Sequence, residues 1–241
     1  MKKELKQQIK QDELRTGFEH AAGWATTHRD EVRVTLLALA VVGLAAVGYG
    51  SYRSHRQASA EKAFDEALTV FHSPVAGQPD AALTGGTVYA TAAEKNQKAA
   101  AAFADIAKSY GGSATGRRAR YYAALANLEL GKTAEAEAEL KDLSSGGDDA
   151  LVRGLARLAL ADLHRSNGRW DPAIEGYRKI LDDTGSAVPR DHALMRLAST
   201  FEDAQRAPDA LAAYLRLIEE FPSSVYVSDA RRRREYLGVR G

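Results

Sequence analysis

The sequence predicts an all-α fold in which a single transmembrane helix is followed by an α-solenoid of helix pairs. Three observations predict this fold: an uncharged apolar stretch, a 37-residue repeat, and turn-rich segments that recur in one phase of that repeat. The chain has 241 residues, which is long enough for a membrane anchor and a domain with its own core.

The apolar stretch comprises residues 34–52 and lies between Arg33 and Arg53. Its 19 residues read VTLLALAVVGLAAVGYGSY. As an α-helix this stretch would be about 28 Å long, close to the thickness of a bilayer's hydrocarbon core. A buried core helix and a cleaved signal peptide are the alternatives. The 33 preceding residues include six acidic side chains, unlike a short basic leader, so we predict an uncleaved anchor.

The tail before the anchor, residues 1–33, carries seven Lys and Arg side chains. Short flanks rich in Lys and Arg stay in the cytoplasm, so we expect a cytosolic tail and a periplasmic repeat domain. Apolar residues recur at helical steps in the tail, at Leu5, Ile9, Leu14 and Phe18. A helix lying on the membrane, a helix docking a partner and a solvated tail all remain open.

The chain repeats with a period of 37 residues from about Ala99 to Pro222. A small residue is followed four positions later by a large one, and three further on by an aliphatic one. The four copies are Ala99, Phe103 and Ile106; Ala136, Leu140 and Leu143; Ala173, Tyr177 and Ile180; and Ala210, Tyr214 and Leu217. This spacing places all three on one helix face, which we expect to be buried.

Turn residues between the repeated positions indicate helix pairs. Gly131 and Gly168 suit the left-handed end of a helix, and Gln205 takes the same position in the third copy. Asp171 and Pro172 suit an N-cap followed by the first helical residue. Turn-rich segments occupy residues 111–116, 144–149 and 184–189. A single pair cannot bury its apolar face, so at least three pairs must stack.

At these positions the chain resembles the tetratricopeptide repeat (TPR) family. The family's A-x(3)-F/Y pattern is matched by Ala173 with Tyr177 and by Ala210 with Tyr214, and its terminal proline by Pro222. The chain departs from the family in its longer period, which is usually about 34 residues, and in lacking the early Trp. The resemblance implies a scaffold that binds proteins.

The anchor and the repeat together predict the domain organisation. We expect a tail at residues 1–33, a transmembrane helix at 34–52 and a repeat domain at 53–241. The repeat units lie near residues 57–110, 117–147, 154–184 and 191–222, with a capping helix at 228–237. The first unit is split, because a loop at residues 73–86 separates its helices.

The whole chain resembles the single-span ancillary subunit of the bacterial Sec translocon. The likeness lies in the architecture, in residues 59–71 and in the stretch Ala123-Ala124-Leu125-Ala126. It implies an inner-membrane protein that binds the translocon and links it to periplasmic chaperones or secreted chains. A scaffold for another envelope machine, in outer-membrane assembly or cell division, is the alternative.

Composition and motifs argue against an enzyme. Lys and Arg number 33 against 32 Asp and Glu, unlike the basic excess of nucleic-acid binders, and cysteine is absent. Residues 111–118 resemble a phosphate-binding loop but end in two arginines, where Lys and a hydroxyl are needed. The six histidines form no pair at metal-ligand spacing. We expect no cofactor, metal, small-molecule substrate or nucleic acid.

The predicted functional surface is the groove lined by the first helix of each pair, suited to an extended peptide or an amphipathic helix. The candidate groove residues are Arg118, Tyr121, Leu125, Leu128, Leu155, Leu158, Asp162, Arg165, His192, Met195, Ser199 and Glu202. Several of these leucines could instead be core between neighbouring helices. A small-residue pair in the anchor, Ala46 and Gly50, leaves a homo-oligomer open.

Overall fold

The computed structural model describes residue 24 and residues 26–79, 86–146 and 149–240. Over these residues the chain is helical, and the β-structure consists of an isolated bridge between Val75 and Tyr89. This confirms the predicted all-α class. The tail residues Leu5, Ile9, Leu14 and Phe18 lie outside the described residues.

The apolar stretch is part of helix α2, Arg29–His72. The chain divides into two compact units, Met1–Arg56 and Gln57–Gly241, and the division falls inside this helix. In the first unit every residue of 34–52 is exposed, Leu44 to 74%. The stretch reaches a mean hydropathy of 2.0 and is long enough to cross a bilayer. By length and composition it is a candidate membrane span.

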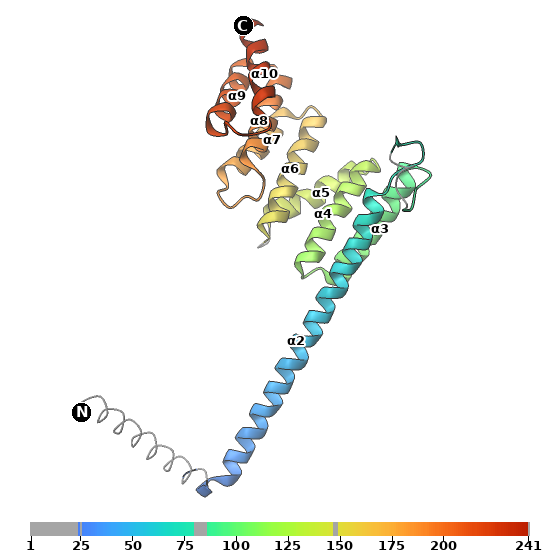
Figure 1. The fold of residues 1–241 in the computed structure, drawn as a ribbon, viewed down its shortest axis with the longest axis vertical. Helices are drawn as coiled ribbons and strands as arrows, with labels where there is room; N and C mark the ends of the chain where they lie inside the picture. The colour runs from blue at the N-terminus through green and yellow to red at the C-terminus, as the bar shows by residue number, and fades with distance from the viewer. Residues whose placement is uncertain (1–23, 25, 80–85, 147–148, 241) are drawn as a thin grey trace, which may run out of the picture. The chain divides into compact units, whose positions relative to one another are not determined.

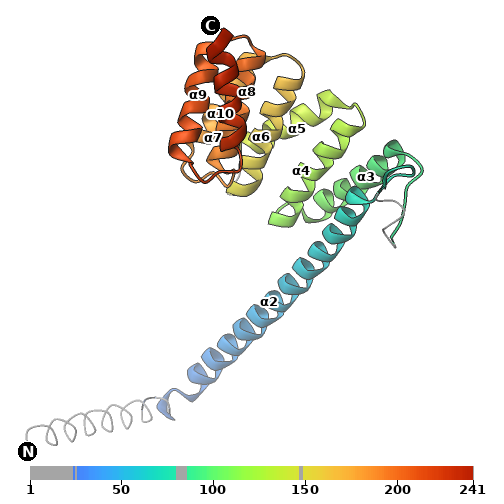
Figure 2. The same ribbon diagram turned by 45° about the horizontal axis from the view of Figure 1, so that its top comes forward.

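The second unit consists of the end of α2 and a series of paired helices (Figure 1). The helices are α3 (Ala92–Tyr110), α4 (Ala114–Glu129), α5 (Thr133–Ser145), α6 (Ala150–Ser166), α7 (Trp170–Asp182), α8 (Arg190–Asp203), α9 (Ala207–Glu220) and α10 (Val227–Arg240). From α3 onward each helix packs against the helix that follows it in the chain. Figure 2 shows α6 to α10 side by side, as expected for a solenoid.

The core consists of the repeated positions. All twelve residues of the predicted face are buried, and the four alanines, Ala99, Ala136, Ala173 and Ala210, are completely so. The aromatic rings of Phe103, Tyr177 and Tyr214 are likewise inaccessible to solvent, because they pack within the hydrophobic core clusters. This confirms the 37-residue period.

Helix starts differ from the predicted ones by a few residues because of capping. Helix α4 starts at Ala114, ahead of the predicted unit, since the Ser113 hydroxyl accepts from the Gly116 amide. Asp149 caps α6 in the same way. The predicted N-cap Asp171 is wrong: α7 begins at Trp170, two residues before the predicted first helical residue, and the Asp171 carboxylate accepts from Arg206 at 2.7 Å instead.

Candidate protein-binding groove

The twelve candidate groove residues lie four each on α4, α6 and α8, the first helices of their pairs. Each is half-buried, neither fully in the core nor fully in solvent. Their spacing of three or four residues puts the members of each set on one helix face.

Five of the twelve surround one cavity of about 600 Å³ between α4 and α6. Tyr121, Leu125 and Leu128 contribute from α4, and Leu158 and Asp162 from α6. The remaining lining residues are Glu129, Thr133, Ala159, Leu163, Ser166 and Asn167. We call this cavity the α4–α6 groove. Its volume is that of a site for a ligand or peptide segment, larger than a packing defect.

The wall of the α4–α6 groove consists of apolar side chains that are only partly buried against the core. Tyr121 and Leu128 pack at the edge of the cluster formed by α4, α5 and α6, and Leu158 packs at the edge of the next cluster. Burial raises the pKa of Tyr121 to about 12, so its side chain stays neutral at physiological pH.

A second cavity of about 600 Å³ adjoins this groove and shares Glu129 with it. Its lining includes Phe71 at the end of α2 and Lys95 and Asn96 on α3. The sequence prediction missed Glu129, although its position four residues after Leu125 places it on the same side of α4. Thr133, Ser166 and Asn167 were missed because they come from helix ends that only the fold brings together.

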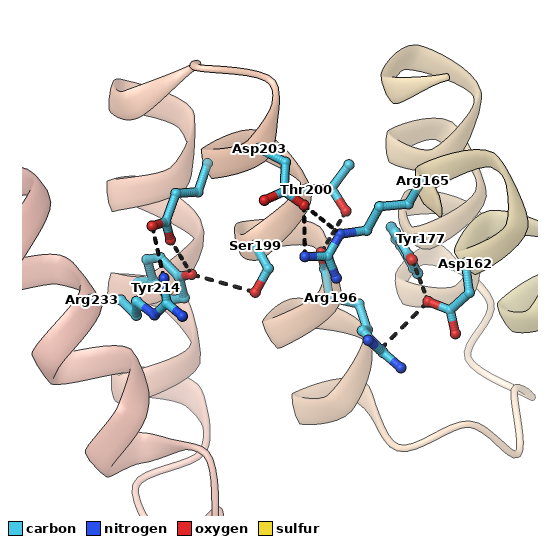
Figure 3. Close-up of polar contacts among 10 residues, drawn as sticks. Asp162, Arg165, Tyr177, Arg196, Ser199, Thr200, Asp203, Tyr214 and Arg233 are labelled. Carbon is cyan, nitrogen blue, oxygen red and sulfur yellow. Dashed lines mark hydrogen bonds and ion pairs between the residues drawn. The ribbon is translucent and has the colours of Figure 1, made fainter. Parts of the chain in front are cut away.

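Polar candidates nearer the C-terminus form hydrogen bonds and ion pairs that join neighbouring helices, and we call each such group of contacts a tie (Figure 3). The Tyr177 hydroxyl donates to Asp162 Oδ1 at 2.5 Å, and Arg196 Nε lies 3.5 Å from the same oxygen. Burial, then the bond to Asp162, raises the pKa of Tyr177. Asp162 therefore joins α6, α7 and α8.

The same tie recurs 37 residues later in a modified form. The hydroxyls of Ser199 and Tyr214 lie 3.4 Å apart, and Tyr214 donates to Glu202 Oε2 at 2.9 Å. Arg233, which corresponds to Arg196, donates to Glu202 Oε1 at 3.0 Å. Figure 3 shows both ties on successive helix pairs.

Other predicted groove residues are also engaged within the domain. Arg118 donates to Glu61 of α2 at 2.6 Å, and Arg165 donates to Asp203 at 2.7 Å. His192 Nδ1 lies 2.8 Å from the Tyr226 hydroxyl. Two apolar candidates, Leu155 and Met195, lie outside the α4–α6 groove, and Met195 packs against the core. The apolar candidates that line a cavity therefore lie on α4 and α6.

The groove lining combines apolar side chains with carboxylates and hydroxyls. Across the described residues, no group of three His, Asp or Glu side chains gathers as a metal ion would require. The groove offers apolar contact area, carboxylates and hydroxyls, which favour non-covalent recognition.

Comparison with known families bears on the repeats. The family model described as a tetratricopeptide repeat-like domain matches residues 28–184, more than half of the chain. A second model, described as a tetratricopeptide repeat, matches residues 158–225. A comparison with curated proteins gives no match. The two family matches confirm the resemblance expected from the repeated positions.

Proposed function

Because the chain belongs to the tetratricopeptide repeat-like family, we propose that it is a membrane-anchored adaptor that binds other proteins through the α4–α6 groove. The observation that carries this proposal is the groove itself, in which five half-buried apolar side chains line a cavity of about 600 Å³. Such a surface suits the apolar face of a partner helix or an extended segment.

Site-specific photocrosslinking in intact cells tests the groove. A photoreactive phenylalanine at Leu125 is expected to give adducts with another protein. The matched control is Leu215, an exposed leucine on α9 away from the groove. Adducts from position 215 but not from 125 would contradict the proposed binding surface.

Membrane attachment through residues 34–52 is the second part of the proposal. An exposed apolar helix surface of this length is unfavourable in water and favourable in a bilayer. The family match begins at residue 28, so it includes this segment together with the repeats. We propose that residues 1–33 are cytosolic and that residues 53–241 form the periplasmic repeat domain of an inner-membrane protein.

The proposed partners are subunits of the Sec translocon and the periplasmic chaperones or chains that leave it. This rests on the resemblance of the whole architecture to the translocon's ancillary subunit. The alternative is a scaffold in outer-membrane assembly or cell division. Purification in mild detergent, followed by identification of the crosslinked partner, separates them: Sec subunits support the first, and assembly or division proteins the second.

A further inference from the structure

We infer that the α4–α6 groove selects a partner segment in which large apolar side chains are flanked by Lys or Arg. The inference rests on the proposed function, since it assigns chemistry to the partner of that groove. It follows from the charges and hydrogen-bonding groups around the apolar wall.

The two ionisable carboxylates of the groove lining are Glu129 and Asp162, and the lining includes neither Lys nor Arg. The Glu129 side chain is exposed, and no hydrogen bond or ion pair joins it to a residue that the structure describes. A negative charge of this kind beside an apolar wall favours a cationic group on the partner and repels an acidic one.

Asp162 contributes at the other side of the groove. One of its oxygens accepts from Tyr177, and Arg196 lies near that oxygen at 3.5 Å. The Asp162 side chain remains one-third exposed, so it can interact with a partner without losing these contacts. The apolar residues Leu125, Leu128 and Leu158 line the same cavity as the two carboxylates.

The adjoining cavity offers a further acceptor. Asn96 is only 3% exposed, and its Oδ1 has no hydrogen-bond partner among the described residues. A buried carbonyl oxygen without a donor is unfavourable, so a donor from the partner stabilises it. The adjoining cavity is also lined by Lys95, so a neutral N–H group of the partner suits Asn96, while its cationic side chain suits Glu129, which the two cavities share.

The test uses the full chain in mild detergent and a library of random peptides displayed on phage. The expected outcome is enrichment of Leu, Ile, Met or Phe next to Lys or Arg. For an enriched peptide, Glu129→Gln is expected to weaken the affinity about three- to fivefold, as for a part-exposed ion pair. Glu129→Lys weakens it further, and added salt weakens the wild-type complex.

Glu219→Gln is the matched control, because Glu219 is an exposed carboxylate on α9 outside the groove. It should leave the affinity unchanged. Leu125→Ser removes part of the apolar wall and should abolish binding, while Leu215→Ser should not. Unfolding curves of each variant separate lost binding from lost folding, and Glu129 has no packing role that could confuse the two.

Enriched peptides without Lys or Arg, or equal affinity of wild type and Glu129→Gln, would overturn the inferred chemistry. If Leu125→Ser still abolished binding, the proposed function would survive that result. Peptide binding that is insensitive to Leu125→Ser would overturn both. Self-association of the chain that is lost in Leu125→Ser would place a second copy in the groove and also overturn the inference.

Discussion

Gln205 adopts a backbone conformation that favours glycine. Its φ is +58°, and the equivalent residues of the two preceding pairs, Gly131 and Gly168, have φ of +75° and +69°. An L-residue in this left-handed region is destabilised because its Cβ approaches the following carbonyl oxygen. The third turn of the repeat is therefore strained where the first two are not.

Replacing Gln205 with glycine is expected to raise the free energy of unfolding by about 1 kcal/mol. Gln205 is exposed, so the substitution removes little packing. Urea denaturation of the full chain measures the change. Gly168→Ala should shift stability in the opposite direction. An unchanged or lowered stability of Gln205→Gly would show that the turn is not strained.

The Tyr177 side chain is both buried and hydrogen-bonded. Its ring is completely buried and its hydroxyl donates to Asp162. Tyr177→Phe should lower the free energy of unfolding by about 1–2 kcal/mol, because a bond to a charged acceptor is lost. Tyr121→Phe is the control, since the structure shows no hydrogen bond from its hydroxyl to a described residue. Equal losses in the two variants would contradict the importance of the tie.

The buried core residues could be predicted from the sequence. The positions of the groove residues could be predicted, but their contacts with other helices could not. The buried faces follow from a spacing along one helix, so Ala173 and Tyr177 are recognisable in isolation. The roles of Arg118 and Arg165 depend on Glu61 and Asp203, which lie on other helices. No periodicity within α4 or α6 reveals such partners.

Between elements, α6 and α7 approach each other closely at Gly176. A methyl group built on Gly176 would lie 2.8 Å from the Ala161 side chain. Gly176 was not predicted from the repeat, because it lies outside the repeated positions. This contact determines how closely the third pair packs.

Gly176→Ala is expected to destabilise the protein by about 1–3 kcal/mol, because the added methyl group overpacks the α6–α7 contact. Gly238→Ala on α10 is the matched control: it has open space around it and removes a poor helix former. Thermal unfolding followed by circular dichroism compares the two. Equal effects would mean that close packing at Gly176 is not required.

Helix α2 joins the predicted anchor to the predicted first helix of the repeats. The sequence predicted an anchor at residues 34–52 and a first repeat helix from about residue 57 that continues out of the membrane. The structure has one helix, Arg29–His72, whose first part is apolar and whose last part buries Phe64 in the repeat core. Residues 53–59 contain neither Pro nor Gly, so nothing interrupts the helix.

The whole molecule combines a solenoid of tetratricopeptide repeats with a proposed membrane anchor. The solenoid follows from the family and from the buried repeat positions. The anchor and its orientation are proposals based on the apolar stretch and on the basic tail before it. Every proposed partner depends on the side of the membrane that the repeats occupy.

A measurement of membrane topology is therefore the most direct test of the proposed periplasmic adaptor. The chain has no cysteine, so Ser145→Cys on α5 and Gln7→Cys ahead of the apolar stretch each create a single labelling site. Spheroplasts are treated with a membrane-impermeant maleimide, and lysed cells serve as the control for reactivity. We expect labelling at position 145 and not at position 7. Labelling at position 7 alone would place the repeats in the cytoplasm and contradict a periplasmic adaptor.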